Sequence, residues 1–484
     1  MRNLNSGADP LVRAGRPRPA LDRADQSADW ATDTGQAKAC PTEYQDIFEQ
    51  VLDAARAHGV AEIEAIVSCE HEALTRFANN AIHQNVAEQT SHLSVRPVMG
   101  GRTARASTNR LDRDSIRRVV EEAIAIARLT EPDPDLLPLG EPAEYRAVER
   151  RFEATAQATP EERALAVAEA IGVVEDAGQT AAGIYSTGGA AFALLNSRGV
   201  SAWHSETMAR FSITAMAADS SGWAKGSACY HGDLDPVQLA LRAARKATAS
   251  RAPRELPPGR YTVILEPAAV LDLVGQMFGD FSATAVRDGR SFLNDRIGKK
   301  LFGENITIHD DVWHGGQAGA PFDGEGVPRK RLTLVDRGVV GEIAYSRQAA
   351  ALAGTAPTGH GFPLPNEFGE APMNIVIAGG DSSVDEMLAS TERGILVTRL
   401  WYIREVDPYE KIFTGMTRDG TFLVEGGRVT AGLRNFRFNQ SLIEMLSNVE
   451  ALSAAVRASG EESFDMVVPA MKVRDFNFTE VTRF

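Results

Sequence analysis

An internal duplication is the feature that most constrains how this chain can fold. A predicted helix, strand-forming runs, a turn, further strands and a second helix follow one another over about residues 42–128. The same order returns over about residues 159–249. Helices and strands of this kind remove their apolar faces from water only by packing on one another. The repeat therefore predicts helices that cover one face of an antiparallel sheet.

The two copies can be followed element by element. Asp112 in the first copy and Asp235 in the second stand just before the closing helix, where a carboxylate accepts hydrogen bonds from free helix N–H groups. Both are therefore predicted as N-caps rather than catalytic acids. The first copy has predicted helices at 42–57 and 115–128 and strands at 62–68, 73–77, 83–99 and 103–107; the second has helices at 160–177 and 237–249 and strands at 200–218 and 224–230.

The composition changes after a proline-rich stretch at residues 251–259. Beyond it, short strand-like runs separated by glycine turns dominate, as in a β-rich domain. The predicted fold class is therefore α+β. A duplicated N-terminal domain of helices and antiparallel sheet is expected over residues 41–255, and a β-rich C-terminal domain over residues 256–484.

Three helices and several hairpins are predicted in the second half. One helix is predicted at 267–278, another after the capping box Ser383-x-x-Glu386, and a third at 441–457. Asp419-Gly420 lies between strand-like runs and is predicted as a hairpin turn, because glycine supplies the positive φ that such turns need.

Residues 1–40 mix Pro, Gly, Asp and Arg without a hydrophobic period, which predicts a disordered extension. No apolar run follows the early arginines, as a secretory signal requires, and three cysteines are too few for a disulfide framework. The longest uncharged stretch, residues 179–197, contains too many Gly, Ser and Thr residues to span a membrane well. We therefore expect a cytoplasmic protein without a membrane partner.

Charge and missing motifs exclude several function classes. The chain has 51 Lys and Arg against 65 Asp and Glu, a formal net charge of −14, whereas nonspecific nucleic-acid binding needs a basic face. We therefore expect no direct nucleic-acid partner. The sequence contains no GxxxxGK[ST], GxSxG, SxxK, HExxH or CxxC motif. Nucleotide hydrolysis, α/β-hydrolase chemistry and a zinc ribbon thus have no support.

Two groups of residues have the chemistry of metal ligands. The segment His309-Asp310-Asp311 with His314 offers imidazoles and carboxylates at short spacing, which suits zinc or a similar ion. The same segment is typical of a strand end entering a glycine loop, where acidic residues meet water. Cys69 and His71 share one face of a predicted strand, but no further ligand is near. A structural role is favoured for both groups.

Two further groups suit a peptide ligand. Asp323 and Glu325 lie between glycines, where they can contact a ligand backbone or simply close a loop. Arg290, followed by Ser291, offers a guanidinium that can hold a peptide carboxylate through two hydrogen bonds, or can pair with a local Asp.

Several of these motifs, in their order along the chain, resemble the TldD/PmbA family. The resemblance extends over roughly residues 43 to 450. The segments that carry it are Arg76-Phe77-Ala78-Asn79-Asn80, Gly289-Arg290-Ser291-Phe292, Ile308-His309-Asp310-Asp311, Pro321-Phe322-Asp323-Gly324-Glu325-Gly326-Val327-Pro328 and Thr391-Glu392-Arg393-Gly394.

The resemblance implies an intracellular metalloprotease that degrades or matures peptides, often as a heterodimer of homologous subunits. In that family the TldD type carries an HExxxH metal motif and a later cysteine ligand, whereas the PmbA (TldE) type lacks them and helps to enclose the peptide. Aligned on Gly279-Asp280-Phe281, the two histidines fall on Val270 and Gly275 and the glutamate on Leu271. No cysteine follows Cys229. The chain therefore resembles the PmbA type.

What this resemblance implies can be stated residue by residue. We expect no catalytic residue and no metal ligand in this chain, zinc only in a TldD-type partner, and an unstructured peptide as substrate. Arg290, Ser291, Asp323 and Glu325 are the expected peptide-binding residues, and an exposed sheet edge in the β-rich half is expected to pair with the peptide. Two alternatives stay open: an active metallopeptidase that uses His309 and His314, and a non-enzymatic interaction protein.

Overall fold

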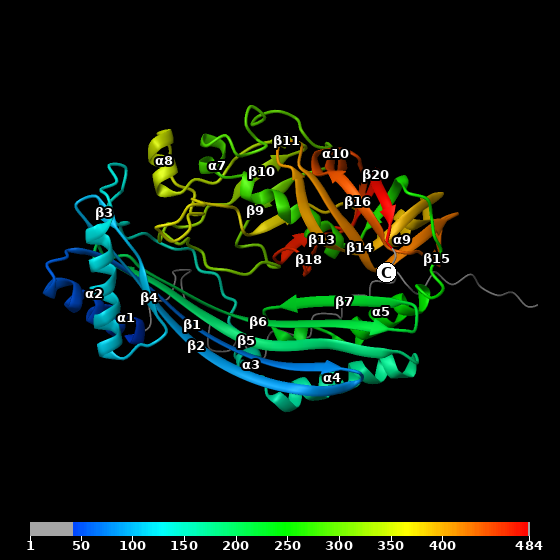
Figure 1. Ribbon diagram of the computed structural model, residues 1–484, viewed down its shortest axis with the longest axis horizontal. Helices are drawn as coiled ribbons and strands as arrows, with labels where there is room; N and C mark the ends of the chain where they lie inside the picture. The colour runs from blue at the N-terminus through cyan, green and yellow to red at the C-terminus, as the bar shows by residue number, and fades with distance from the viewer. Residues whose placement is uncertain (1–41, 483–484) are drawn as a thin grey trace, which may run out of the picture.

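The computed structural model describes residues 42–482, and the predicted extension over residues 1–40 lies outside them. Helices and strands alternate in an α+β arrangement, as predicted, with the strands divided among three sheets. A long curved sheet formed by the first half lies along one side of the molecule, and the second half forms a body above it (Figure 1). No helix within residues 42–482 combines the length and apolar character needed to cross a membrane.

The first half places both copies of the repeat in one antiparallel sheet of order β3-β2-β1-β5-β6-β7, because β1 of the first copy pairs with β5 of the second. The strand β4 pairs with β2 beside β3. The elements are α1 Thr42–Ala57, β1 Glu62–Ala78, β2 Ala81–Met99, β3 Arg102–Thr103, β4 Ala106–Thr108, α2 Arg113–Leu129, α3 Glu153–Ala156, α4 Pro160–Asp176, β5 Thr180–Asn196, β6 Ser201–Met216, β7 Ser221–Ala228, the 3-10 helix η2 His231–Asp233 and α5 Pro236–Ala249.

The helices cover a single face of this sheet, which confirms the prediction from the repeat. Odd-numbered residues of β1 and β5, such as Val67 and Leu195, pack with α1 and α2, and Tyr185 of β5 packs with α4 and α5. Because successive side chains of a strand point to opposite faces, the even-numbered residues face the other way. Among them Ile66 and Leu194 contact Phe322 of the second half.

Local signals in the repeat are confirmed with one change. The Asp112 carboxylate accepts the Ser115 N–H and the Asp235 carboxylate accepts the Gln238 N–H, so both are N-caps. The turn at Asn79 and Asn80 has positive φ at both residues, as a tight hairpin requires. The runs at 62–68 and 73–77 are one strand, β1, because β2 and β5 pair with it through the exposed middle that breaks its hydrophobic pattern.

The second half contains two sheets. One has six strands in the order β11-β10-β9-β12-β19-β18, and the other has seven strands, five of which close into a ring. In the latter, β13 pairs with both β8 and β14, so β13-β8-β20-β16-β14 forms a closed barrel. The elements are β8 Gly259–Leu265, α6 Pro267–Val274, the 3-10 helix η3 Gly275–Asp280, α7 Ala283–Arg287, β9 Ile308–Asp310, β10 Leu332–Asp336, β11 Val339–Val340, α8 Arg347–Ala353, β12 Ile375–Ile377, α9 Val384–Ala389, β13 Arg393–Asp407, β14 Ile412–Glu425, β15 Arg428–Gly432, β16 Phe436–Ser441, α10 Leu442–Ser447, β17 Val449–Leu452, β18 Val456–Ala458, β19 Met466–Val468 and β20 Met471–Val481.

Two local predictions in the second half were wrong. Asp419-Gly420 is not a hairpin turn but a bulge inside β14, where the pairing with β13 shifts register and both residues have positive φ. The helix predicted at 441–457 stops at Ser447, since the following residues form β17 and pair with β20. The capping box at Ser383 and Glu386 is confirmed.

Polar contacts join the two halves along the open face of the long sheet. The Arg150 guanidinium, at 6% exposure, donates to the carbonyl oxygens of Val312, His314 and Gly319. The Tyr145 hydroxyl donates to the Gly326 carbonyl at 2.8 Å. These bonds fix the loops of the second half against β5 and β6.

Candidate functional site

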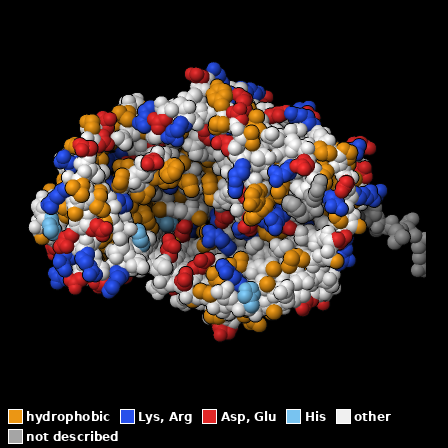
Figure 2. All heavy atoms as spheres, in the orientation of Figure 1, with side chains coloured by type: hydrophobic (Ala, Val, Ile, Leu, Met, Phe, Trp, Pro, Cys, Tyr) orange, Lys and Arg blue, Asp and Glu red, His pale blue; other side chains and the backbone are white. Residues whose placement is uncertain are grey.

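A cavity of about 220 Å³ lies where β5 meets the loops of the second half. Figure 2 shows this face of the molecule hollowed between the two halves, with hydrophobic side chains above the hollow and charged side chains of both signs below it. The walls of the cavity are mostly aromatic or apolar, with a few buried charged groups. The lining residues are Phe192, Ala320, Phe322, Asp323, Gly324, Arg329, His360, Gly361, Phe362, Pro363, Ala371 and Met373.

Asp323 lines this cavity and holds its own loop in place. The buried carboxylate accepts the backbone N–H groups of Glu325, Val327 and Gly361 at 2.7–2.9 Å. Burial raises the pKa of Asp323, and these hydrogen bonds oppose the rise. The third bond reaches across to the chain segment that forms the opposite wall. Asp323 therefore sets the shape of the cavity through the backbone.

Glu325 lies behind the cavity wall and is almost fully buried. One carboxyl oxygen accepts the Arg347 N–H at 2.8 Å, while the other, Oε1, has no hydrogen-bond partner. Burial, reinforced by the neighbouring Asp323 carboxylate, raises the pKa of Glu325 to about 7. The pair can therefore hold a proton near neutral pH, which is the range of acid–base chemistry and of charge-dependent binding.

The structure adds an Asp–His pair that sequence reasoning missed. The His360 Nε2 atom lies 3.1 Å from the Asp310 Oδ1 atom, and both side chains are fully buried. Burial raises the pKa of Asp310, but the His360 contact and a nearby arginine outweigh it, so the pKa is lowered overall. The Asp310 Oδ2 atom also accepts the N–H groups of Met373 and Asn374. No local motif surrounds His360, so the sequence distinguishes it from the other eight histidines in no way that would indicate this pairing.

Arg290 and Ser291 lie in a different part of the second half. The exposed Arg290 guanidinium pairs with Asp288 at 3.0 Å. The buried Ser291 hydroxyl donates to the Asp280 carbonyl and accepts the Leu293 N–H. Neither residue lines the cavity beside Asp323. The four predicted peptide-binding residues are therefore not brought together in one place.

The other predicted ligands are spread along the chain. His309 lies in the middle of β9 between β10 and β12, and burial lowers its pKa, whereas the His314 Nδ1 atom accepts the Gly316 N–H. The Cys69 thiol lies 3.5 Å from the Ser91 hydroxyl, and the His71 Nε2 atom 3.0 Å from the Ala156 carbonyl. Across residues 42–482, His, Cys, Asp and Glu side chains form no group of three or more suited to a metal ion.

The segment onto which the resemblance places the metal motif is tightly packed. Val270 and Leu271 on α6 are fully buried in the main core of the second half. At Gly275 an added Cβ atom would lie 2.6 Å from the Ser463 Cβ and 2.9 Å from the Met466 Cε. No side chain, and therefore no imidazole, fits there unless the side chains of Ser463 and Met466 move. The residues present do not fit a zinc ion of the HExxxH type.

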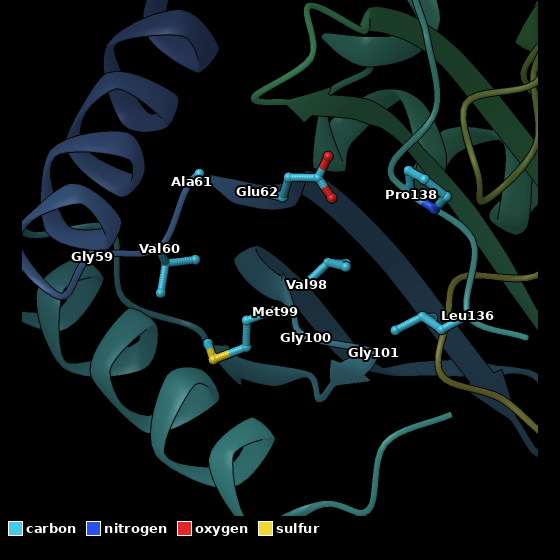
Figure 3. A pocket seen from close by; sticks show the side chains of 10 residues that line it. All are labelled: Gly59, Val60, Ala61, Glu62, Val98, Met99, Gly100, Gly101, Leu136 and Pro138. Carbon is cyan, nitrogen blue, oxygen red and sulfur yellow. The ribbon is translucent and has the colours of Figure 1, made fainter. Parts of the chain in front are cut away.

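A second, larger cavity lies at the end of the long sheet where β1 begins and β2 ends. Its volume is about 430 Å³, and its walls come from the start of β1, the end of β2 and residues 136–138 (Figure 3). Glu62 is its only charged residue, and the Glu62 carboxylate is held by Arg198 at 2.9 Å. This cavity therefore offers mainly apolar contacts and has fewer ionisable side chains in its walls than the cavity at Asp323.

Comparison with known families accounts for most of the chain. Three family models match in order: PmbA/TldA metallopeptidase domain 1 over residues 64–127, the central domain over residues 150–251, and the C-terminal domain over residues 258–480. The chain belongs to the PmbA/TldD metallopeptidase family. The resemblance seen in the sequence is thus confirmed at the level of the family.

Individual relatives in this family are distant. Metalloprotease PmbA of Escherichia coli O157:H7 is 25% identical over 77% of this chain and 83% of its own length. A metalloprotease of Methanothermobacter thermautotrophicus is 26% identical, but the match spans only 60% of that relative and 55% of this chain. A TldD homologue of Buchnera aphidicola is 26% identical over 43% of each chain.

Solved structures show the same fold. TldE from Thermococcus kodakarensis superposes with a TM-score of 0.80 at 19% identity and covers 90% of this chain and 100% of its own. A protein of Thermotoga maritima described as a putative modulator of a DNA gyrase superposes with a TM-score of 0.79 at 21% identity, with the same coverage. At these identities the likeness concerns the fold alone.

Proposed function

We propose that this member of the PmbA/TldD family is the non-metal, peptide-binding subunit of a heterodimeric metalloprotease, working beside a TldD-type subunit on unstructured peptides. The packing at Gly275 is the observation that carries the proposal. Where the metal-bearing type needs a second imidazole, this chain has a glycine pressed against Ser463 and Met466. Val270 and Leu271 supply neither a ligand nor a general base at the other two motif positions.

The peptide-binding part of the proposal is supported by the cavity at Asp323. Its volume of about 220 Å³ is below the range of about 300–1,000 Å³ usual for whole small-molecule ligands, and it suits a single large side chain. Phe192 forms its wall on the sheet side, and Phe362 belongs to the facing loop. An extended peptide lying in the hollow would place one apolar side chain between these rings.

The role proposed for Asp323 and Glu325 follows from their hydrogen bonds. Because both carboxylates are buried and hold backbone N–H groups, they would act by keeping the cavity wall in shape for the peptide. Arg290, whose guanidinium is exposed, is proposed as a separate contact for a peptide carboxylate. Ser291 would support it by fixing the turn through Asp280.

Metal content tests the first part of the proposal. The chain should be purified alone and together with the TldD-type homologue from the same genome, and zinc measured by mass spectrometry. We expect less than roughly 0.1 zinc per molecule alone, and chelator-sensitive cleavage of unstructured peptides only in the mixture. Cleavage by the chain alone that is lost in a His309→Ala variant would replace this proposal with an active metallopeptidase.

Peptide binding tests the second part. The double variant Asp323→Ala/Glu325→Ala should weaken binding of a fluorescent unstructured peptide to the assembled complex by roughly tenfold or more, with unchanged circular dichroism. The exposed pair Asp381→Ala/Glu392→Ala is the matched control and should bind like wild type. Equal binding by both double variants would remove the Asp323 loop from the peptide site.

A further inference from the structure

We propose that the outer edge of β2, over residues 81–92, is the surface on which the TldD-type subunit docks, through antiparallel pairing with the corresponding strand of that subunit. This inference rests on the proposed function, because it concerns how the two homologous subunits of that protease join. It names a surface and the chemistry of its partner: an extended strand that supplies backbone N–H and C=O groups.

The edge is long and open. On its outer side β2 pairs with β4 at residues 93–95 and with β3 at residues 98 and 99. Within residues 42–482, no strand pairs with the outer side of residues 81–92. At about 3.4 Å per residue this run extends about 40 Å. Its outward N–H and C=O groups form a template for another strand.

Apart from one bulge close to the turn, the edge lacks the devices that usually prevent strand pairing. Natural edge strands carry lysines, prolines, bulges or inward charges, or are very short. Residues 81–92 contain no Lys, Arg or Pro, and Glu88 is the single formally charged residue among them, with His neutral. The register shift between β1 and β2 leaves His83 as a bulge between Ile82 and Gln84, close to the turn, and the pairing is regular from Gln84 to His92.

Both faces of this run are accessible to an incoming chain. Every residue from 81 to 90 except Val86 is exposed, and Ile82 has 38% of its surface accessible. On the neighbouring strand Glu70 and Glu72 are exposed as well. A partner strand could therefore approach without displacing any described segment. The added strand would then partly bury the exposed apolar and neutral polar side chains of this run.

A homologous strand fits this edge better than an unrelated one. The family model for domain 1 includes most of β1 and all of β2, so a family partner brings an equivalent hairpin with an edge of its own. Two such edges can pair antiparallel about a two-fold axis, which repeats each contact on both sides. A register that places Glu88 opposite Asn85 keeps the two Glu88 carboxylates of identical edges from facing each other.

Such pairing has a consequence for the hollow. Residues directly opposite in an antiparallel pair lie on the same face of the sheet. The face of this chain that carries Phe192 and meets the second half would therefore continue into the corresponding face of the partner. Both second halves would then stand on one side of a shared sheet.

Charged edge variants test the proposal directly. Ala87→Lys/Gln89→Lys places two lysines on exposed edge positions, and Leu129→Lys/Leu165→Lys places two on exposed helix positions as the matched control. Affinity for the TldD-type homologue, measured by biolayer interferometry, should fall by roughly 100-fold for the edge variant and less than threefold for the control. Both variants should keep the wild-type melting temperature. Wild-type affinity in the edge variant would overturn the proposal.

Hydrogen exchange of the wild-type chain gives a test that no variant can confound. Amides of residues 81–92 that exchange rapidly in the isolated chain should slow by roughly tenfold or more after the homologue is added. Protection already present without the homologue would assign the edge to a second copy of this chain or to its own N-terminal residues. Protection by an unstructured peptide alone would assign it to substrate. Either result would overturn the proposal.

The two proposals fail in different ways. If the wild-type chain does not bind the homologue at all, the proposed function falls, and this inference falls with it. If wild type and edge variant bind equally well, only the docking surface is wrong and the heterodimer stands.

Discussion

Individual buried residues decide what the second half can do chemically. Asp323, Glu325 and Asp310 are buried carboxylates, and each accepts hydrogen bonds from backbone N–H groups. Gly275 matters because it has no side chain, which leaves room for Ser463. Each of these residues therefore has a measurable effect on stability, separate from any role in binding.

Glu325 makes the stability of the fold depend on pH. Its folded-state pKa of about 7 lies above the ordinary value of 4.5, so the folded protein keeps a proton that the unfolded chain releases. The free energy of unfolding should therefore fall as pH rises from about 4.5 to 7 and level off above it. Glu325→Gln, which does not titrate, should be more stable than wild type by about 3 kcal/mol at pH 7.5 and nearly equal to it near pH 4.5.

Denaturant titrations between pH 4.5 and 8 measure this difference. The exposed Glu304→Gln variant is the control and should follow the wild-type profile. A constant offset between Glu325→Gln and wild type across this range would show that burial does not shift the titration of Glu325.

Two glycines of the same 3-10 helix should respond oppositely to alanine. At Gly275 the added Cβ atom collides with Ser463 and Met466, and overpacking of this kind costs about 1–3 kcal/mol. At Gly279 nothing lies within 4 Å of the added atom, so Gly279→Ala should change the free energy of unfolding by less than about 0.5 kcal/mol. Chemical denaturation compares them, and equal effects would refute the packing described at Gly275.

At the scale of elements, the sequence predicted what depends on neighbouring residues. The N-caps, the hairpin at Asn79 and Asn80 and the amphipathic helices of the repeat all follow from short-range hydrogen bonds or helical spacing. The Asp323 loop belongs here too, since two of its three bonds reach residues only two and four positions away. Such features are visible in any stretch of sequence that contains both partners.

Features that depend on distant partners were missed. The middle of β1 lacks a hydrophobic pattern, and only pairing with both β2 and β5 makes it a strand. Residues 449–452 continue a helical spacing but are taken by β20. His360 reaches Asp310 across 50 positions of sequence, so no local motif could connect them. Conformations imposed by tertiary contacts override local propensity at these places.

The matching N-caps give a prediction about two elements. Asp112→Ala and Asp235→Ala should each destabilise the first turn of α2 and α5, by about 1 kcal/mol, because the N–H groups of Ser115 and Gln238 lose their acceptor. Hydrogen exchange should show faster exchange confined to those first turns. A loss of peptide binding without any change in exchange would instead indicate a functional role for these carboxylates.

For the whole molecule, the important question is how the two halves are held together. The polar part of this contact includes Arg150, with three carbonyl oxygens of the second half around one guanidinium. Lys225 adds a bond to the Gly460 carbonyl at the other end of the sheet, and Arg457 one to the Ser227 hydroxyl. The hollow between the halves therefore keeps its shape through these hydrogen bonds together with the small apolar cluster around Phe322.

Removing the Arg150 guanidinium should loosen this contact. Arg150→Gln leaves buried carbonyl groups without a donor, and lost hydrogen bonds to a charged group cost about 1.5–3 kcal/mol each. We expect a lower denaturation midpoint and faster amide exchange over residues 312–319. The neighbouring Arg151→Gln variant, which loses only an exposed pair with Glu153, is the control and should behave as wild type. Unchanged exchange at 312–319 would show that other contacts hold the halves.

The closed barrel determines the order in which the chain can fold while it is being made. The strand β8 pairs on one side with β13 and on the other with β20, near the end of the chain. Roughly 200 residues separate β8 from β20, so at about 5–20 residues per second the ribosome needs on the order of 10–40 s to supply the second partner. The long sheet of the first half needs no residue beyond Ala228 and can form earlier. Val263, Ile264 and Leu265 are an apolar strand with both edges open until β13 is made, and the edge that later pairs with β20 stays open for the whole interval, so this nascent segment has the character of a chaperone substrate.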